Sequence, residues 1–241
     1  MQEEQFDINQ VEVAGTIKKI WSHGDLDIWL RLEIPNDEHT RRITLRIPEG
    51  MIAGEMIPLQ SSEVIAVGGI LVNSPWEELL TKFLENADIP QERIAELNIN
   101  GREIKRMSTR VDALMLEKLE RLPEEPLKDV HIQGLVINTW TYSGNHYARL
   151  AVYDEHTKII KYSQPFPKRE AHYVTVQSQT ALKEKRKIRG QGQIVVRLYR
   201  ESVSEVVQKM RLVLDLSEKE LDAYVIKPSV YANLGTLVMF G

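Results

Sequence analysis

The chain has 241 residues, of which 42% are hydrophobic and 27% charged, a mixture typical of a globular protein with one or two domains. It contains no cysteine, which excludes disulfides, zinc–thiolate sites and thiol nucleophiles. No apolar run approaches the roughly 18 residues of a membrane helix, and the polar N-terminus is unlike a signal peptide, so we expect a cytoplasmic protein with no membrane partner.

The charge is spread unevenly along the chain, although the total is only −4. Residues 1–126 carry 14 Lys and Arg against 24 Asp and Glu, residues 127–200 carry 13 against 5, and residues 201–241 carry 4 against 6. The middle block is therefore basic, with acidic flanks. Because such a block creates a local positive field despite the negative total, a polyanion remains a candidate partner.

The strongest pattern is an internal repeat of two copies. Residues 11–21 and 130–140 both alternate apolar and polar side chains over their first half, carry a glycine at the centre and end in tryptophan. The alternation predicts a half-buried strand. The glycine predicts the bulge or sharp bend that a small barrel needs to close. Trp21 and Trp140 keep the parity of the apolar positions, so we expect them in the core.

Each copy continues, after a turn, with a second alternating segment, at 28–34 and at 146–152. At matching places both segments have an aromatic residue followed two positions later by arginine. The apolar side chains that alternate with them are predicted to face the interior, so the aromatic and arginine side chains face outward. Their recurrence in two divergent copies favours a shared function over chance.

The remaining strands are predicted from the same alternation and from turn residues. We expect third strands at 42–47 and 172–177, fourth strands at 64–73 and 188–199, fifth strands at 97–107 and 202–214, and a short helix at 181–187.

Two further helices are predicted between the copies. Ser74–Glu77 has the pattern of a capping box, followed by apolar residues at helical spacing, and a second helix fits 110–122 before two prolines. Another capping box, Ser217–Glu220, precedes an apolar segment at 234–240, which we expect to pack on a barrel or on a neighbouring chain. The predicted parts are a first barrel (1–74, with 97–107), a helical insert and linker (75–126), a second barrel (127–215), and a C-terminal helix and apolar tail (216–241).

The sequence resembles the OB-fold single-stranded-DNA-binding proteins in its glycine-bent first strand, its turn and the arginine-bearing strand that follows. The run Arg149–Glu155 is similar to OB domains of replication protein A type, and His172–Leu198 resembles the third strand, helix and fourth strand of the bacterial proteins. The resemblance implies a mainly β fold of two five-stranded OB barrels in tandem. The helical insert and the apolar C-terminus depart from the family pattern, which usually ends in a disordered acidic tail.

A single strand of nucleic acid offers a charged backbone and unpaired bases, so binding without sequence preference needs a basic groove and aromatic platforms. The outward aromatic and arginine residues and the basic run 183–189 supply both. We therefore predict sequence-independent binding of single-stranded DNA in replication, recombination or repair. The residues expected to contact the strand are Trp29, Arg31, Arg42, Arg46, Tyr147, Arg149, Tyr153, Tyr173, Lys183, Lys185, Arg186, Lys187, Arg189, Arg197 and Tyr199.

Other functions remain open. The barrels can instead be scaffolds of a protein-assembly subunit that binds partners through the acidic insert and the apolar C-terminus, or they can bind single-stranded RNA. A second copy of the chain, forming a homodimer, is a further candidate partner. The six histidines show no HExxH spacing, and no nucleotide-binding or nucleophile motif occurs, so we expect neither an enzyme nor a cofactor or metal.

Overall fold

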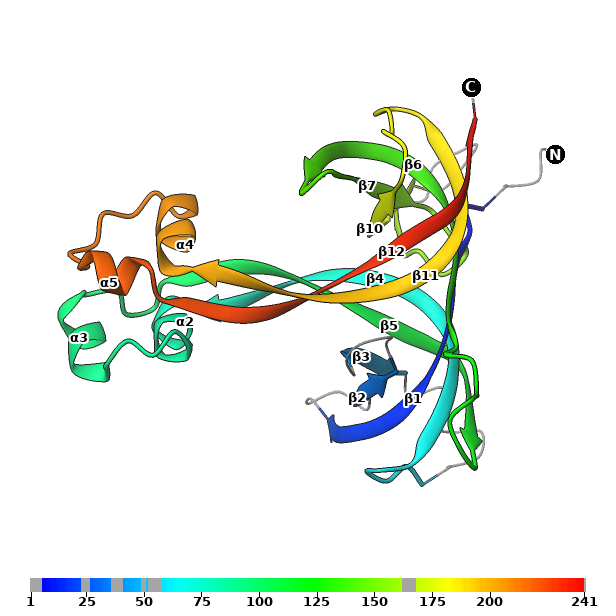
Figure 1. Cartoon of the computed structure of the whole chain (residues 1–241), viewed down its shortest axis with the longest axis horizontal. Helices are drawn as coiled ribbons and strands as arrows, with labels where there is room; N and C mark the ends of the chain where they lie inside the picture. Colours follow the sequence, from blue (N-terminus) through cyan, green and yellow to red (C-terminus); the bar gives the residue numbers. More distant parts are fainter. Residues whose placement is uncertain are drawn as a thin grey trace. The chain divides into compact units, whose positions relative to one another are not determined.

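The computed structural model describes residues 6–22, 27–35, 41–48, 51, 58–161 and 168–240 (Figure 1). The chain divides into two compact units. The barrel unit comprises Met1–Asn73, Thr109–Val196 and Val230–Gly241, and the helical unit comprises Ser74–Ser108 and Arg197–Ser229. Among the described residues, no helix has the length and apolar character needed to cross a membrane.

The first five long strands close a ring, which we call the first ring. β1 pairs with β2 and β4, β2 pairs with β3, and β5 lies between β3 and β4. β1 is antiparallel to β2 and β4, and β2 is antiparallel to β3, whereas β3 and β5 are parallel. The strands are β1 (Asn9–Ser22), β2 (Ile28–Ile34), β3 (Arg41–Ile47), β4 (Val64–Leu79) and β5 (Glu103–Leu119).

The second ring repeats this order with five later strands. They are β6 (Lys128–Tyr142), β7 (Asn145–Val152), β10 (His172–Ser178), β11 (Lys187–Ser202) and β12 (Tyr224–Phe240). β6 pairs with β7 and β11, and β10 pairs antiparallel with β7 and parallel with β12. A five-stranded ring of this kind is the architecture of the OB fold. The mainly β fold class predicted from the sequence is confirmed.

β1 and β6 join the rings edge to edge, so that all ten strands belong to one sheet. The short strands β8 (Ile159–Lys161) and β9 (Lys168–Arg169) form a separate pair. One hydrophobic core runs through both rings, and the inward side chains of the second strands, such as Leu30, Leu32 and Leu150, are fully buried. The predicted inward parity of these strands is therefore confirmed.

The repeat extends to backbone details. Both first strands have a β-bulge, between Ile17 and Lys19 and between Val136 and Asn138. Both glycines in these strands lie against a neighbouring backbone: a Cβ added to Gly15 would be 2.4 Å from the carbonyl oxygen of Glu33, and one added to Gly134 would be 2.8 Å from that of Ala151. These positions need glycine because no side chain fits there.

The bulges overturn the expectation that Trp21 and Trp140 are core residues. An extra residue in a strand reverses the parity of every residue after it. Trp21 therefore pairs directly with Trp29, and Trp140 with Tyr147, on the outer face. Trp140 is 37% exposed, and Trp21 is partly exposed.

The N-terminal segment ties the two rings together. The amide of Asn9 donates to the carbonyl oxygen of Leu71 (2.9 Å) and to Oδ2 of Asp154 (3.0 Å), and its Oδ1 accepts from the Leu71 N–H. The same Asp154 oxygen lies 3.0 Å from Nδ1 of His172. Burial alone would raise the pKa of Asp154, but the contacts with His172, Asn9 and the backbone N–H of His156 lower it overall. We call this cluster the ring junction.

The helical unit has its own core. It contains α2 (Leu80–Asn86), α3 (Gln91–Glu96), α4 (Val203–Lys209) and α5 (Glu218–Leu221), together with the ends of β4, β5, β11 and β12. Phe83 and Val203 are fully buried in it. A buried ion-pair network links three strands. Arg106 of β5 contacts Glu78 of β4 (3.0 Å) and Glu201 of β11 (2.6 Å).

Several predicted elements are wrong. Residues 202–214 do not form the fifth strand of the second ring, because Ser202 caps the helix α4, with Glu205 completing the capping box. Residues 110–122 are not a helix but largely the strand β5, and 181–187 is a turn with no helix. The helix expected after Ser74 begins only at Leu80, without a side-chain cap. The predicted fifth strand at 97–107 overlaps β5 only from Glu103 onward.

The fifth strands therefore come from segments that the sequence assigned elsewhere. Residues 109–119, expected in the insert between the barrels, lie in β5 of the first ring. The apolar C-terminal segment is part of β12 and closes the second ring, with Leu234 buried in the core. The expectation that this segment packs on a barrel is confirmed for Leu234 and the half-buried Leu237, whereas Val238, Met239 and Phe240 are exposed. The capping box at Ser217 and Glu220 is confirmed.

Candidate nucleic-acid interface

The outer face of the first ring carries a pair of stacked tryptophans. The ring centroids of Trp21 and Trp29 are 6.4 Å apart with an interplanar angle of 22°. The guanidinium of Arg31 lies 5.7 Å from the Trp21 ring, and that of Arg110 lies 5.2 Å from the Trp29 ring. Cations at these distances are attracted by the negative faces of the rings. The face therefore combines aromatic surface with positive charge.

Carboxylates hold the arginines of this face. Oδ2 of Asp112 lies 3.2 Å from Nη2 of Arg46, and Oδ1 of Asp112 lies 2.6 Å from Nε of Arg110. Arg46 also contacts Asp27, at 3.6 Å. We call these four residues the charged cluster.

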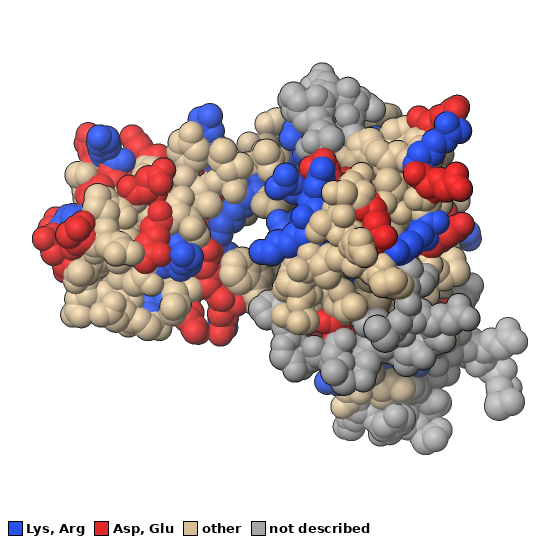
Figure 2. Space-filling model, turned by 90° about the horizontal axis from the view of Figure 1, so that it is seen from below, with Lys and Arg blue, Asp and Glu red and all other residues tan. Residues whose placement is uncertain are grey.

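A second pairing lies farther along the same strands. Arg42 contacts Glu33 at 3.4 Å, and Lys18 contacts the other oxygen of that carboxylate at 2.9 Å. The hydrogen bond from Lys18 is the largest cause that lowers the pKa of Glu33. Arg42 and Arg46, both predicted to contact the strand, are therefore on the expected face but paired with acids. On the face of the molecule drawn in Figure 2, a group of Lys and Arg side chains lies together near the middle of the view, and Asp and Glu side chains lie beside other Lys and Arg side chains.

The outer face of the second ring is an aromatic stack. Trp140 and Tyr147 stack with centroids 5.8 Å apart and planes at 10°, and Tyr231 meets Tyr147 edge-on at 5.6 Å. Tyr147 is only 7% exposed, because these two rings cover it. The accessible platform is therefore Trp140 rather than the predicted Tyr147.

The charged cluster has a neutral counterpart in the second ring. Gln177 takes the place of Arg46, since each lies opposite the aromatic residue of the second strand. In the parallel pairing of each ring, Arg46 faces Asp112 and Gln177 faces Asn233. Gly69 packs against the backbone of Asp112 and Gly192 against that of Asn233, which supports the match.

Two more positions complete the correspondence. Asn145 corresponds to Asp27, two positions before the matched aromatic residues, and Tyr231 corresponds to Arg110, two positions before Asn233 and Asp112. Nε2 of Gln177 donates to Oδ1 of Asn145 at 2.9 Å, in place of the ion pair between Arg46 and Asp27. The same framework thus carries four charged residues in one ring and four uncharged ones in the other.

The matched arginines Arg31 and Arg149 share another property. Both lie on the outer faces, and among the described residues the buried Nε of each has no hydrogen-bond acceptor. A buried donor without an acceptor destabilises a protein. A phosphate oxygen or base oxygen of a bound strand that came within hydrogen-bond distance would accept a hydrogen bond from this Nε.

The basic run lies in and beside the turn that connects β10 to β11. Lys183, Lys185 and Arg186 are exposed, and the Lys185 N–H donates to the carbonyl oxygen of Val136 (2.8 Å), which fixes the turn against β6. The chain reverses at Lys185, with φ of 63°, instead of forming the predicted helix. This turn therefore offers three exposed cations beside the second ring.

The last two basic residues of the run are engaged within the barrel unit. Lys187 pairs with Asp7 at 2.6 Å, and Arg189 donates to Nε2 of His131 at 3.0 Å. Burial, followed by the charge of Arg189, lowers the pKa of His131.

The other predicted contact residues are divided between the units. Tyr153 and Tyr173 are 43% and 39% exposed on the second ring. Arg197 and Tyr199 belong to the helical unit, and burial raises the pKa of Tyr199.

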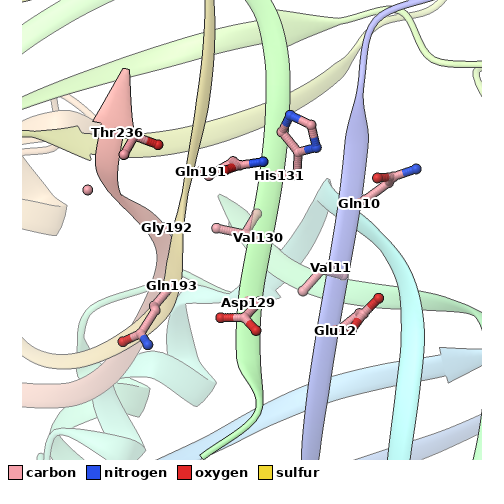
Figure 3. A pocket seen from close by; sticks show the side chains of 11 residues that line it. Gln10, Val11, Glu12, Asp129, Val130, His131, Gln191, Gly192, Gln193 and Thr236 are labelled. Atoms are coloured by element: carbon pink, nitrogen blue, oxygen red, sulfur yellow. The ribbon is translucent and has the colours of Figure 1, made fainter. Parts of the chain in front are cut away.

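A shallow groove of about 460 Å³ runs across β1, β6, β11 and β12 (Figure 3). Its side chains form rows across the strands, with Glu12 next to Asp129 and Gln10 next to His131. The residues that line the groove include two carboxylates and no Trp, Tyr or Phe. It is therefore less suited to a nucleic-acid strand than the outer faces.

The predicted contact residues do not include four aromatic or basic residues of these faces, Trp21, Trp140, Arg110 and Tyr231. The tryptophans were assigned to the core because the bulge or bend was predicted at the central glycine, whereas the bulges lie between the glycines and the tryptophans. Arg110 and Tyr231 were missed because β5 and β12 were not identified in full. The two tryptophans occupy the same position in the two sequence copies, and this match could have indicated that they belong to the shared site.

The sequence matches no family model, and no curated protein is similar to it in sequence. Among solved structures, the single-stranded DNA binding protein from Thermus aquaticus is similar, with a TM-score of 0.51 and 14% identity over 98% of this chain and 95% of that chain. A deletion mutant of the Thermus aquaticus protein gives a TM-score of 0.50 and 15% identity over 98% and 96% of the two chains. The resemblance found in the sequence is confirmed for the fold: this chain has the mainly β, OB-type fold of that protein.

Proposed function

We propose that the protein binds single-stranded DNA, without catalysis and largely without sequence preference. The observation that carries this proposal is the matched arrangement on both rings, an aromatic pair beside an arginine: Trp21 and Trp29 with Arg31, and Trp140 and Tyr147 with Arg149. Each base stacked on an aromatic side chain contributes about 1–3 kcal/mol, and every base has a face to stack.

Electrostatic attraction supports the same proposal. The exposed turn with Lys183, Lys185 and Arg186 lies beside the second ring and attracts phosphates of any sequence. The second ring therefore supplies most of the attraction, since the first ring pairs Arg42 and Arg46 with carboxylates.

The solved protein that shares this fold is, by its name, a single-stranded DNA binding protein. A fold alone does not determine function, but here it agrees with the chemistry of the outer faces. The cellular role that follows from such binding is protection of exposed strands in replication, recombination or repair.

The test is a fluorescence-anisotropy titration of a labelled poly-dT oligomer of about 30 nucleotides, a length sized for two OB rings. We expect salt-sensitive binding that duplex DNA does not compete. A matched RNA oligomer serves as a second competitor, and we expect it to compete more weakly. Absence of binding at micromolar protein and low salt would overturn the proposal and favour the protein-assembly alternative.

A further inference from the structure

In the charged cluster of the first ring, the guanidinium groups of Arg46 and Arg110 are arranged as in a phosphate-binding site, but the carboxylate of Asp112 occupies the place of the phosphate. The guanidinium groups of Arg46 and Arg110 both contact the carboxylate of Asp112. Nη2 of Arg46 lies 3.2 Å from Oδ2, and Arg110 donates from Nε to Oδ1 (2.6 Å) and from Nη2 to Oδ2 (3.4 Å). Two guanidiniums around one oxyanion form strong charge-assisted hydrogen bonds, as with a bound phosphate. The side chains of Arg110 and Asp112 are only 13% and 12% exposed, so solvent screens this pair little.

The cluster lies over the aromatic platform. Arg110 stacks on Trp29 at 5.2 Å, and Arg46 is the cross-strand neighbour of Trp29. A strand that stacks a base on Trp29 would bring its phosphates to these arginines. The phosphate and Asp112 would then compete for the same donors.

The second ring has no such competitor. Asn233 stands at the position of Asp112, and Gln177 and Tyr231 stand at the positions of the arginines. At these matched positions, all of them described, no charged side chain has to be displaced before a strand reaches Trp140.

We propose that Asp112 is an internal competitor for DNA phosphate, which holds Arg46 and Arg110 and makes the first ring the weaker of two unequal binding sites. This inference rests on the proposed function and adds the order in which the rings are filled. The second ring binds first. The first ring binds when the local strand concentration is high enough to displace the carboxylate.

The deciding variant is Asp112→Asn, which places the residue of the second ring into the first at nearly unchanged size. We expect binding of the labelled poly-dT oligomer to tighten about three- to tenfold at low salt. The log–log salt dependence should steepen by about 0.7 for each phosphate gained. If the asparagine variant is unstable in a thermal melt, Asp112→Ser removes the same charge and should give the same gain.

The matched control is Asp129→Asn, which removes one negative charge from the groove of the same unit. Among the described residues Asp129 is in no ion pair with an arginine, so only the small general effect of charge is expected. The gain from Asp112→Asn should also shrink in an Arg46→Gln background and disappear when Arg110→Gln is added, because both released donors are then absent.

The outcomes separate the two proposals. If the wild type binds and Asp112→Asn binds no more tightly than Asp129→Asn, the inference is overturned while the proposed function stands. If neither the wild type nor the variant binds, the proposed function fails, and the inference fails with it.

Discussion

The outer faces of the two rings share an aromatic pair and a matched arginine, yet four further matched positions are charged in the first ring and uncharged in the second. Asp27, Arg46, Arg110 and Asp112 surround Trp29 in the first ring. The second ring has amides and tyrosines at the same places. In contrast, the bulges and the glycines against the neighbouring backbone are the same in both. The residues that close the ring are constrained by packing, whereas those on the outer face are free to differentiate.

The largest difference in strand binding between the two rings should come from base stacking. Trp140→Ala removes the exposed platform of the second ring, and we expect it to weaken strand binding by about 1–3 kcal/mol, or roughly 5- to 150-fold. Trp21→Ala should cost less, because the charged cluster already limits binding at the first ring. Anisotropy titrations of both variants test this. A larger loss for Trp21→Ala would reverse the ranking of the two faces.

The shared framework can be tested through its glycines. Gly15→Ala places a Cβ 2.4 Å from a carbonyl oxygen, and Gly134→Ala places one 2.8 Å from the matching oxygen. Overpacking costs about 1–3 kcal/mol. We expect both variants to lose stability in urea unfolding, Gly15→Ala more than Gly134→Ala. Unchanged stability of both would show that ring closure does not need these residues.

The basic turn should contribute electrostatically only. Replacing Lys183, Lys185 and Arg186 with glutamine removes three exposed cations, and we expect binding to weaken by about tenfold at low salt. The log–log salt dependence should become shallower by about 2. Titrations at four or more salt concentrations measure both quantities.

The control for the basic turn removes three exposed cations of the helical unit, Arg102, Lys105 and Lys219. An equal loss in this control would mean that net charge, rather than the position of the turn beside the second ring, governs binding.

The smallest effect is expected at the ring junction, which belongs to neither face. The pKa of Asp154 is lower in the folded chain than its ordinary value of 3.8, so the carboxylate stabilises the fold above that value. This stability is lost as the pH falls through the lowered pKa. Urea unfolding between pH 5 and pH 2.5 or so should show the loss, and Asp154→Asn should remove that part of the pH dependence.

Regular strands could be predicted from the sequence, but departures from regularity could not. The second strand of the first ring was predicted at 28–34, and β2 has the same bounds in the structure. A bulge or bend was predicted at the central glycine, but the bulge lies after Ile17. Its place could not be predicted, because one extra residue leaves no mark on composition while it reverses the outward face. In α4 the signal was present: Ser202 and Glu205 form a capping box, and Val203, Val206 and Val207 follow at helical spacing.

Part of the candidate nucleic-acid interface could be predicted for the same reason. Trp29 and Arg31 lie on the outer face, as local alternation indicates. The partner of Arg46 could not be predicted, because Asp112 comes from a parallel strand after a long intervening segment. Whether an arginine is available to a ligand depends on such distant neighbours.

Asn9 has a consequence for how the protein is made. Its first partner, Leu71, lies 62 residues ahead, and its second, Asp154, lies 145 residues ahead. The ribosome releases the N-terminal half first, and that half generally folds first. The first ring can then close with the Asn9 edge of β1 still open, and an open edge invites wrong pairing with other nascent chains. β5 ends at Leu119 and β6 begins at Lys128, so the strand that covers this edge is the next one to emerge.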